Sequence, residues 1–339
     1  MKDKIGYIIG TLLLVAFFVW MALDYNQRIN SIQEFSKNMF YMDTYISVKI
    51  YTKDKVKAKE ALDSIDKIYE TYNNLTDRYN SYDGTNNIYK INNNTLTDEK
   101  LTIDEKLYDL IFYGIDMYEE TNGLININLG HVIDVWKSYR ESESGVPTYE
   151  ELKNSGSIDI NDIQLLDNNQ ILNNHPCIDL GSIAKGYTNQ IVADYLKSIG
   201  LNSFLINAGG SVVVGEHYAN DTYKIGIETP TSEGGVYDVV SFNNKSLTTS
   251  GNYQRYYIYD KVLYHHIIDP NTLFPPNYFR SVSVITNNAA LGDMLSTTLF
   301  LMTIEDGKTY LKENYPDVEA VWYTNDDEIE RTEGFSNYE

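Results

Sequence analysis

The chain has 339 residues, with 27 Lys plus Arg against 48 Asp plus Glu and a formal net charge of −21. This excess of acid argues against nucleic acid as a partner, because binding a phosphate backbone depends on clustered Lys and Arg. It disfavours an anionic membrane surface for the same reason. Hydrophobic residues make up 42% and charged residues 22%, which is typical of a folded globular protein. The single cysteine, Cys177, excludes an intramolecular disulfide and a cysteine-cluster metal site, and the apolar stretch after it favours a small buried side chain.

An uncharged apolar run, Ile5 to Leu23, lies near the start of the chain, after Lys2 and Lys4. At about 1.5 Å per helical residue, this run can just cross a hydrocarbon core about 30 Å thick. The two lysines predict that the amino terminus stays in the cytoplasm and that the rest of the chain is exported. We therefore expect a single-pass cell-membrane anchor over residues 1–24, with the folded part of the chain extracytoplasmic. A cleavable signal peptide is the alternative, but residues 21–23 make a poor cleavage site.

The rest of the chain is predicted to be a polar tether, residues 25–37, followed by one folded domain over residues 38–339. Residues 45–51 alternate between apolar and polar side chains, which predicts a half-buried strand. Periodic apolar residues predict three helices, over residues 55–73, 101–120 and 185–198. Short β-rich runs separated by Gly, Asn and Pro predict antiparallel sheet at residues 204–214, 223–228 and 236–242. Because helices and strands fall into separate blocks, the predicted fold class is α+β.

The segment from Asp179 to Tyr187 leads from a predicted strand end through small residues into a predicted helix. Small residues let backbone amides approach a ligand, the helix amino terminus attracts phosphate, and Lys185 can add a positive charge. An ordinary strand-to-helix turn capped by Ser182 would have the same pattern, so the motif alone leaves both interpretations open. The paired glycines of Asn207-Ala208-Gly209-Gly210 likewise fit a plain turn as well as a turn that faces a ligand.

Two later segments contain candidate acid-base and metal groups. In His265-His266-Ile267-Ile268-Asp269-Pro270, a histidine pair and an aspartate lie close together, which suits a polar site, although a lone histidine is more often structural. Asp293 and Thr297 share one face of a predicted helix. Carboxylate and hydroxyl oxygens are the hard ligands that Mg²⁺ prefers. An acid at a helix start is also expected from the helix dipole alone, so this motif by itself is ambiguous.

In their order along the chain, these segments resemble the ApbE family, the FAD:protein FMN transferases. The matching motifs are Asp179-Leu-Gly-x-Ile-Ala-Lys185-Gly, Asn207-Ala-Gly-Gly, Thr249-Ser-Gly-x-Tyr-x-Arg255-Tyr, His266-Ile-Ile-Asp-Pro and Asp293-x-x-x-Thr297. The resemblance runs from Met42 to Met302. It implies an α+β fold and an enzyme that uses Mg²⁺ to split FAD, releases AMP and joins FMN through a phosphoester to a Thr or Ser of a target protein. The targets that it implies are subunits of membrane redox complexes on the outer face of the membrane.

The resemblance also implies roles for individual residues. The metal ligands would be Ser182, Asp293 and Thr297, with Ser182 acting through its carbonyl. Asn126 stands where the family pattern has an acid, and Asp43 stands where it has a glycine. The FAD-binding positions would be, in chain order, Met42, Tyr82, Leu124, Ile125, Asn126, Asp179, Lys185 and Ile268.

The expected chemistry agrees with this resemblance. Splitting a pyrophosphate requires neutralisation of charge on the phosphate oxygens, which Mg²⁺ provides as a Lewis acid. An acceptor hydroxyl must lose its proton on attack, and His266 or Asp269 is the expected base. The sequence therefore predicts a membrane-anchored FMN transferase with FAD and an acceptor protein as partners. The alternatives are a hydrolase that cuts FAD into FMN and AMP with water as the acceptor, and a flavin-binding protein without turnover.

Overall fold

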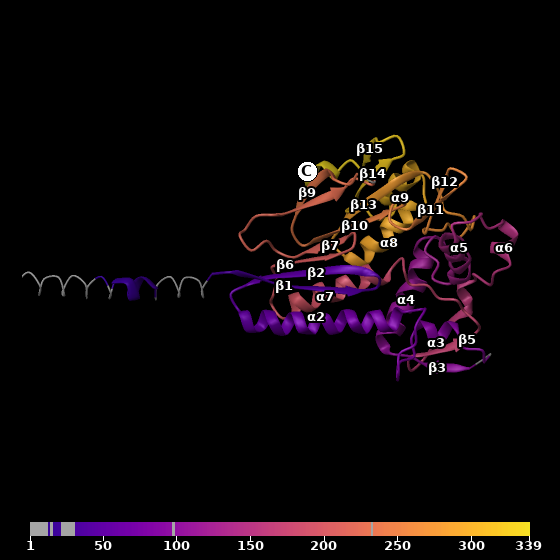
Figure 1. Ribbon diagram of the computed structural model, residues 1–339, viewed down its shortest axis with the longest axis horizontal. Helices are drawn as coiled ribbons and strands as arrows, with labels where there is room; N and C mark the ends of the chain where they lie inside the picture. The colour runs from indigo at the N-terminus through magenta and orange to yellow at the C-terminus, as the bar shows by residue number, and fades with distance from the viewer. Residues whose placement is uncertain (1–12, 14–15, 22–30, 97–98, 232) are drawn as a thin grey trace, which may run out of the picture.

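The computed structural model describes residues 13, 16–21, 31–96, 99–231 and 233–339. Among these residues, the centre of the molecule is an eight-stranded sheet in which every neighbouring pair is antiparallel (Figure 1). Its strands are, in spatial order, β1 (Gln33–Tyr41), β2 (Thr44–Thr52), β6 (Phe204–Ala208), β7 (Ser211–Val214), β10 (Lys245–Gly251), β13 (Phe279–Thr286), β14 (Glu319–Thr324) and β15 (Ile329–Arg331).

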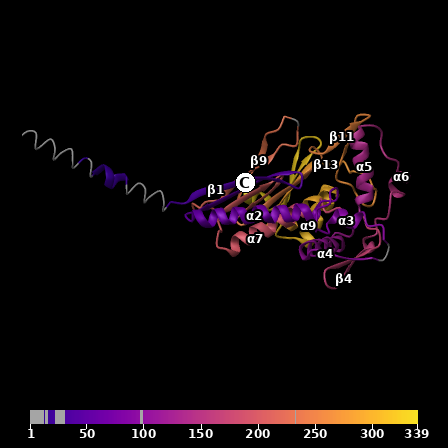
Figure 2. The same ribbon diagram turned by 60° about the horizontal axis from the view of Figure 1, so that its bottom comes forward.

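Three helices cover one face of this sheet: α2 (Lys55–Thr76), α7 (Ala184–Ser198) and α8 (Ala289–Phe300). Helices α2 and α7 run alongside β1, β2 and β6 in both views (Figure 1, Figure 2), and α8 lies against α7, β10 and β13. The core between α2 and the sheet contains Ile65 and Tyr69 from the helix and Ile46 and Val48 from β2. Because α8 is covered on almost every side, most of its residues are apolar, and its one charged side chain is Asp293.

A hairpin of β8 (Tyr223–Glu228) and β9 (Val236–Phe242) covers the opposite face of the sheet. Its buried residues Ile225, Val240 and Phe242 share a core with Leu247 of β10 and Ile285 of β13. The middle of the central sheet, at β10 and β13, is therefore buried on both faces, which makes it a stiff support for the loops at its end.

The remaining elements form a mainly helical part beside the sheet (Figure 1). The helices are α3 (Ile88–Asn92), α4 (Glu105–Glu120), α5 (Gly130–Ser142) and α6 (Tyr149–Lys153), with α9 (Ile304–Asn314) packed nearer to the sheet. Short strands form a three-stranded sheet, β3 (Lys100–Thr102), β5 (Gln170–Asn173) and β4 (Ile163–Leu166), and a hairpin, β11 (Tyr256–Tyr259) and β12 (Val262–His265). Two short 3₁₀ helices span Ile160–Asp162 and Phe335–Tyr338. Trp136 of α5 packs with Tyr257 of β11 and Ile268, which joins α5 to the hairpin.

The predicted combination of helices with antiparallel sheet is confirmed, and so are the predicted helices at α2 and α7 and the strands at β2, β6, β7, β8 and β9. Two predicted boundaries are wrong. Residues 100–102 form β3 and α4 begins only at Glu105, because Asp104 caps it by accepting the Lys106 N–H. The predicted tether overlaps the sheet, since β1 begins at Gln33, where its polar residues alternate along an edge strand.

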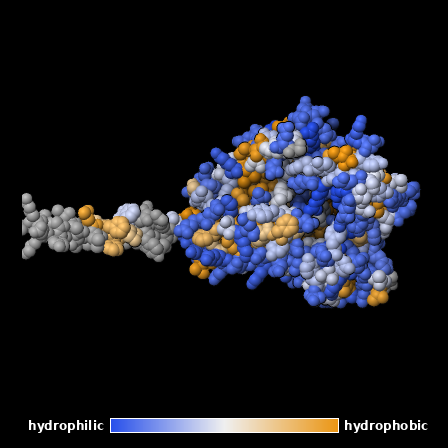
Figure 3. Space-filling model, viewed as in Figure 1, coloured by the Kyte–Doolittle hydropathy of each residue, from blue (hydrophilic) through white to orange (hydrophobic). Residues whose placement is uncertain are grey.

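Most of the predicted anchor, residues 1–24, lies outside the described residues. Within the part of the chain that the structure describes, no helix is both long and apolar enough to span a bilayer. Residues 16–21 are described, are helical, and carry apolar side chains that are about half exposed or more (Figure 3). The visible face of the folded part is mainly hydrophilic by comparison. Cys177 is buried, as predicted.

Candidate active site

A cavity of about 390 Å³ lies where the sheet meets the helical part. Its wall combines the β1–β2 and β6–β7 turns, the end of β10, the start of α7, and parts of α5 and α8. Most of the residues singled out from the sequence therefore meet in one place. Those that line the cavity are Met42, Leu124, Ile125, Asn126, Asp179, Ser182, Lys185, His266, Ile268, Asp293 and Thr297.

The β1–β2 turn supplies Met42 to the cavity wall. Tyr41 pairs with Thr44, and the two residues between them have positive φ angles, 51° for Met42 and 55° for Asp43. A two-residue hairpin turn requires this left-handed backbone, which aspartate tolerates better than most residues, so Asp43 fits where the family pattern has glycine. The Met42 N–H donates to Asn73 Oδ1 at 2.9 Å, which fixes the turn against α2.

The paired glycines of the β6–β7 turn form a tight turn on the cavity wall. Gly209 and Gly210 have φ angles of 53° and 93°, so they form a tight hairpin turn, and both also line the cavity. A Cβ at Gly209 would lie 2.4 Å from Thr44 Cγ2, so glycine is also needed for the close packing of the two turns.

The segment from Asp179 to Lys185 leads into α7 along the cavity. Asp179 Oδ1 accepts the Gly181 N–H at 2.8 Å, which forms a tight turn. The Lys185 ammonium donates to the Gly181 carbonyl at 3.4 Å. The turn therefore holds the small residues and the lysine on the cavity side of the start of α7.

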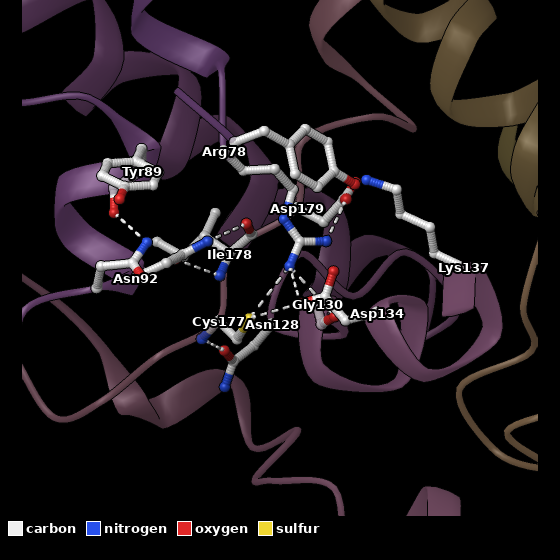
Figure 4. Close-up of polar contacts among 12 residues, drawn as sticks. Arg78, Tyr89, Asn92, Asn128, Gly130, Asp134, Lys137, Cys177, Ile178 and Asp179 are labelled. Carbon is white, nitrogen blue, oxygen red and sulfur yellow. Dashed lines mark hydrogen bonds and ion pairs between the residues drawn. The ribbon is translucent and has the colours of Figure 1, made fainter. Parts of the chain in front are cut away.

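Arg78, which the sequence did not single out, binds the other oxygen of Asp179 (Figure 4). Its guanidinium lies 2.9 Å from Asp179 Oδ2 and 2.8 Å from Asp134 Oδ2, and it donates to the Gly130 carbonyl at 3.3 Å. Burial opposes the charge of Arg78, but the two carboxylates outweigh burial and raise its pKa. Arg78 thus joins the end of α2 to the segment before α7 and to α5, and all three contribute to the cavity wall.

Asp293 lies on α8 directly against the start of α7. Its Oδ2 accepts the Gly186 N–H at 2.7 Å, so the carboxylate satisfies one of the free amides at the amino terminus of α7. Burial raises the pKa of this carboxyl, although Lys185 and the Gly186 N–H act in the opposite direction. Because α8 begins at Ala289, Asp293 is in its second turn, which excludes the ordinary helix-start explanation of this residue.

Hydroxyl groups surround the same end of the cavity. Thr297 follows Asp293 by one helical turn, and Ser250 Oγ lies 3.5 Å from Thr297 Oγ1 and 2.9 Å from Ser296 Oγ. Ser182 and Ser250 also line the cavity. Asp293 is therefore accompanied by neutral oxygen atoms on the cavity wall.

The two adjacent histidines differ in their surroundings. His265 is buried, its Nε2 lies 2.6 Å from the Pro276 carbonyl, and its Nδ1 accepts the Ile267 N–H at 3.2 Å. These bonds assign its proton to Nε2, and burial lowers its pKa to about 4. His266 is half-buried on the cavity wall, and its buried Nδ1 has no hydrogen-bond partner among the described residues. Burial, followed by the nearby charge of Arg255, lowers the pKa of His266 to about 3, so the imidazole is neutral near pH 7.

Two residues singled out from the sequence lie outside the cavity lining. Both oxygens of Asp269 are used in its own turn, because Oδ1 accepts the Asn271 N–H at 2.8 Å and Oδ2 accepts the Thr272 hydroxyl at 3.3 Å. The Tyr82 hydroxyl donates to Asp77 Oδ2 at 2.9 Å, and Asp77 itself lines the cavity. Asp269 and Tyr82 therefore support the wall from behind.

Asn126, which replaces an acid of the family pattern, lines the cavity but holds its own loop. Its amide donates to the Ile158 carbonyl at 2.9 Å, and its Oδ1 accepts the Asn128 N–H at 2.8 Å. The neighbouring Leu124 and Ile125 are held by the same loop and also line the cavity.

Comparisons with known proteins agree with this arrangement. The ApbE family model matches residues 42–322. A protein from Vibrio cholerae serotype O1 named FAD:protein FMN transferase is 27% identical over 304 residues, which cover 88% of each chain.

Solved structures share the fold. The crystal structure of the ApbE protein from Thermotoga maritima has a TM-score of 0.80 and 26% identity, and the match covers 91% of this chain and 99% of that one. The structure of the flavin transferase ApbE from Vibrio cholerae has the same fold, with a TM-score of 0.76, 23% identity, and coverage of 91% and 100%. Since the family model extends over most of the residues and the predicted motifs meet in one cavity, the chain belongs to the ApbE family.

Proposed function

We propose that this chain is an FAD:protein FMN transferase, which splits FAD with the help of Mg²⁺, joins FMN to a Thr or Ser hydroxyl of an acceptor protein and releases AMP. The observation that carries the proposal is one cavity lined by a buried carboxylate, Asp293, a neutral histidine, His266, and a lysine, Lys185. The family membership and the name of the Vibrio cholerae relative support the proposal.

The groups around Asp293 fit a hard divalent cation. One carboxylate oxygen is held by the Gly186 N–H, which leaves the other for a metal, and the nearby oxygens of Ser182 and Thr297 are of the kind that Mg²⁺ prefers. Within the described ranges, no group of three or more His, Cys, Asp or Glu side chains could hold a metal, so neutral oxygens, water and substrate phosphates would complete the shell. When bound, Mg²⁺ would neutralise charge on the pyrophosphate oxygens as a Lewis acid.

His266 is the proposed general base. The acceptor oxygen attacks the phosphorus of the FMN phosphate and forms a new P–O bond, while the P–O bond to the AMP phosphate breaks. AMP leaves with the bridging oxygen, and the proton of the acceptor hydroxyl moves to the imidazole of His266. In the free protein, Arg255, Lys185 and Arg140 all contribute to its low pKa. The pyrophosphate of bound FAD would offset these charges and raise the pKa of His266 towards the range that a base needs.

The remaining residues position the substrates. Lys185 adds a positive charge beside the phosphates, and the Asp179 turn keeps the backbone of the segment close to them. Asp269, whose oxygens are both hydrogen-bonded in its turn, holds the His266 segment in place, so the proton acceptor is assigned to the histidine.

The test measures AMP release from FAD by the purified protein with Mg²⁺, with and without a Thr-containing subunit of a membrane redox complex. AMP only with the acceptor supports the transferase. AMP without acceptor would assign the chain as an FAD hydrolase, and bound FAD without AMP would make it a flavin-binding protein.

The matched variants are Asp293→Asn and Asp194→Asn. Asp293→Asn keeps an oxygen for the Gly186 N–H but removes the negative charge. We therefore expect a folded variant that releases no AMP from FAD, whatever the Mg²⁺ concentration. Asp194 is an exposed acid on α7, hydrogen-bonded to Gln190, and its variant should behave as wild type. Full activity of folded Asp293→Asn, or of wild type in EDTA, contradicts the metal assignment.

We further propose that residues 1–24 anchor the enzyme in the cell membrane with the domain from residue 38 onward outside the cytoplasm, where it would meet a subunit of a membrane redox complex. The exposed apolar side chains of Phe17, Phe18 and Trp20 support an apolar environment for this helix. Protease added to intact wall-stripped cells should digest the domain. Complete protection of a membrane-bound protein would contradict the orientation, and a mature amino terminus near Asp24 would contradict the anchor.

A further inference from the structure

The arginines of this acidic chain are concentrated at the cavity. The sequence contains six arginines, and three of them, Arg78, Arg140 and Arg255, line the cavity. Guanidinium groups are suited to bidentate binding of carboxylate and phosphate oxygens, so their partners indicate what each one does.

Three arginines have close carboxylate partners. Arg78 binds Asp134 and Asp179 as described above, Arg280 lies 2.7 Å from Asp327, and Arg331 lies 2.7 Å from Asp238. These three are structural ion pairs within the fold.

Arg140 and Arg255 differ from those three. Within the described residues, Arg140 has no hydrogen bond or ion pair, and Arg255 has only a contact of 4.0 Å with the exposed Asp43. The two arginines line the same cavity, and the positive charge of Arg255, after burial, lowers the pKa of Arg140. The fold thus holds two like charges together, one on α5 and one after β10, on the wall of the same cavity.

We propose that Arg140 and Arg255 form a phosphate clamp that binds the pyrophosphate oxygens of FAD beside His266. This inference rests on the proposed function, because the dinucleotide is the anion that the reaction brings into the cavity. Two guanidinium groups without a close carboxylate partner match the two negative charges of a pyrophosphate diester, whereas one carboxylate of an acceptor protein would neutralise only one of them. Lys185 lies in the same wall and adds a third cation near His266.

The clamp also accounts for the position of the base. Both arginines line the cavity together with His266, and after burial their positive charges help to lower its pKa. A phosphate held between them would therefore lie next to the group that receives the acceptor proton. The clamp would orient the phosphate for attack and withdraw negative charge from its oxygens as the new bond forms.

The test uses the full chain with Arg140→Met, Arg255→Met and the double variant, and Arg280→Met as the control outside the cavity. Calorimetry measures binding of inorganic pyrophosphate, FAD, FMN, AMP and riboflavin. Each clamp variant should weaken binding of pyrophosphate and FAD about 10- to 100-fold, the usual effect of losing a charge-assisted hydrogen bond, and leave riboflavin unchanged. Arg140→Lys and Arg255→Lys should recover part of the loss, because lysine keeps the charge but not the fork of donors.

Thermal unfolding separates the clamp from a structural role. Removal of one of two neighbouring like charges should leave the melting temperature equal or higher, while binding falls. The FMN and AMP measurements identify which phosphate of FAD the clamp holds. Only the mononucleotide that carries this phosphate should bind more weakly to the clamp variants than to the wild type. Wild-type binding of pyrophosphate and FAD by the double variant overturns the clamp, and so does a loss confined to the acceptor protein. Failure of the proposed function would appear differently, as wild-type protein that binds pyrophosphate but never releases AMP from FAD.

Discussion

Gly186 is the position where the packing of two helices and the geometry of the candidate metal site can be changed by a single methyl group. In Gly186→Ala, the new Cβ would lie 2.3 Å from Asp293 Cβ and 2.4 Å from the Ala289 carbonyl oxygen. Ordinary contact begins at about 3.4 Å, so α7 and α8 must separate by about 1 Å. A backbone oxygen is one of the two obstacles, and rotation of a side chain cannot remove it.

The expected cost follows from these contacts. Glycine to alanine in an open helix position would stabilise the protein by about 1 kcal/mol. Here overpacking costs about 1–3 kcal/mol, and a shift of 1 Å would stretch the 2.7 Å bond from Gly186 N–H to Asp293 beyond hydrogen-bond range. The buried carboxylate then loses its amide partner, which costs about 1–3 kcal/mol more. We expect a net loss of about 1–5 kcal/mol, which corresponds to a fall of several degrees in melting temperature.

Thermal unfolding and AMP release as a function of Mg²⁺ concentration test this expectation. The control is Gly307→Ala on α9, where the nearest atoms would be Leu299 Cδ2 at 3.2 Å and a Trp322 ring carbon at 3.3 Å, side chains that can move slightly. We expect a small change in melting temperature and normal activity from the control. If Gly186→Ala melts and releases AMP as wild type does, the close helix contact is not what positions Asp293.

Four further predictions concern groups on or behind the cavity wall. His266→Ala should lower FMN transfer about 10²- to 10⁴-fold in single-turnover assays with little change in FAD affinity, and a wild-type rate would assign the base elsewhere. His265→Ala should instead lower the melting temperature through loss of the Pro276 bond, with transfer by the folded fraction largely kept. The pKa values of His265, about 4, and of His266, about 3, lie below the value near 6.5 in the unfolded chain. The unfolded state therefore binds more protons, and the free energy of unfolding should fall as the pH drops from 6.5 towards 4. A urea midpoint at pH 5 equal to that at pH 7 would contradict this. Arg78→Met should lower the free energy of unfolding, measured in urea, by about 3–5 kcal/mol, because the largely buried Asp179 loses its ion-pair partner. The double variant Arg78→Met/Asp179→Asn should recover part of that loss.

Periodicity was sufficient to predict the elements with one clearly buried stripe. The apolar spacing of residues 55–73 predicted α2, and the alternation of residues 45–51 predicted β2, because each of these elements buries one face against the other. The short strands β3, β4 and β5 escaped prediction because each has only three or four residues and therefore little alternation. Strand β3 also pairs with β5 across about 70 residues. Strand β3 was assigned to the following helix for this reason.

The family motifs predicted most of the cavity wall, but the motifs could not show how each side chain is used. Asp269 was an equal candidate for the base, and only its two turn-forming hydrogen bonds distinguish it from His266. Arg78 lay outside every motif considered, although its position directly after a long helix in a chain poor in arginine was a usable signal. Its ion pairs bring together residues from distant parts of the chain, which no local pattern contains.

Contacts between distant parts of the chain at the cavity have a consequence for the order of folding. Arg78 and Asp179 are 101 residues apart in sequence, and Gly186 and Asp293 are 107 residues apart. Contacts of such high sequence separation form late, because the entropy of closing a long loop opposes them until neighbouring structure is in place. Helix α2 can therefore form early, whereas a nucleotide-binding cavity exists only once the last helices have docked. In refolding experiments, quenching of flavin fluorescence should lag behind the far-ultraviolet signal of helix formation, and bound FAD should slow unfolding of the whole domain.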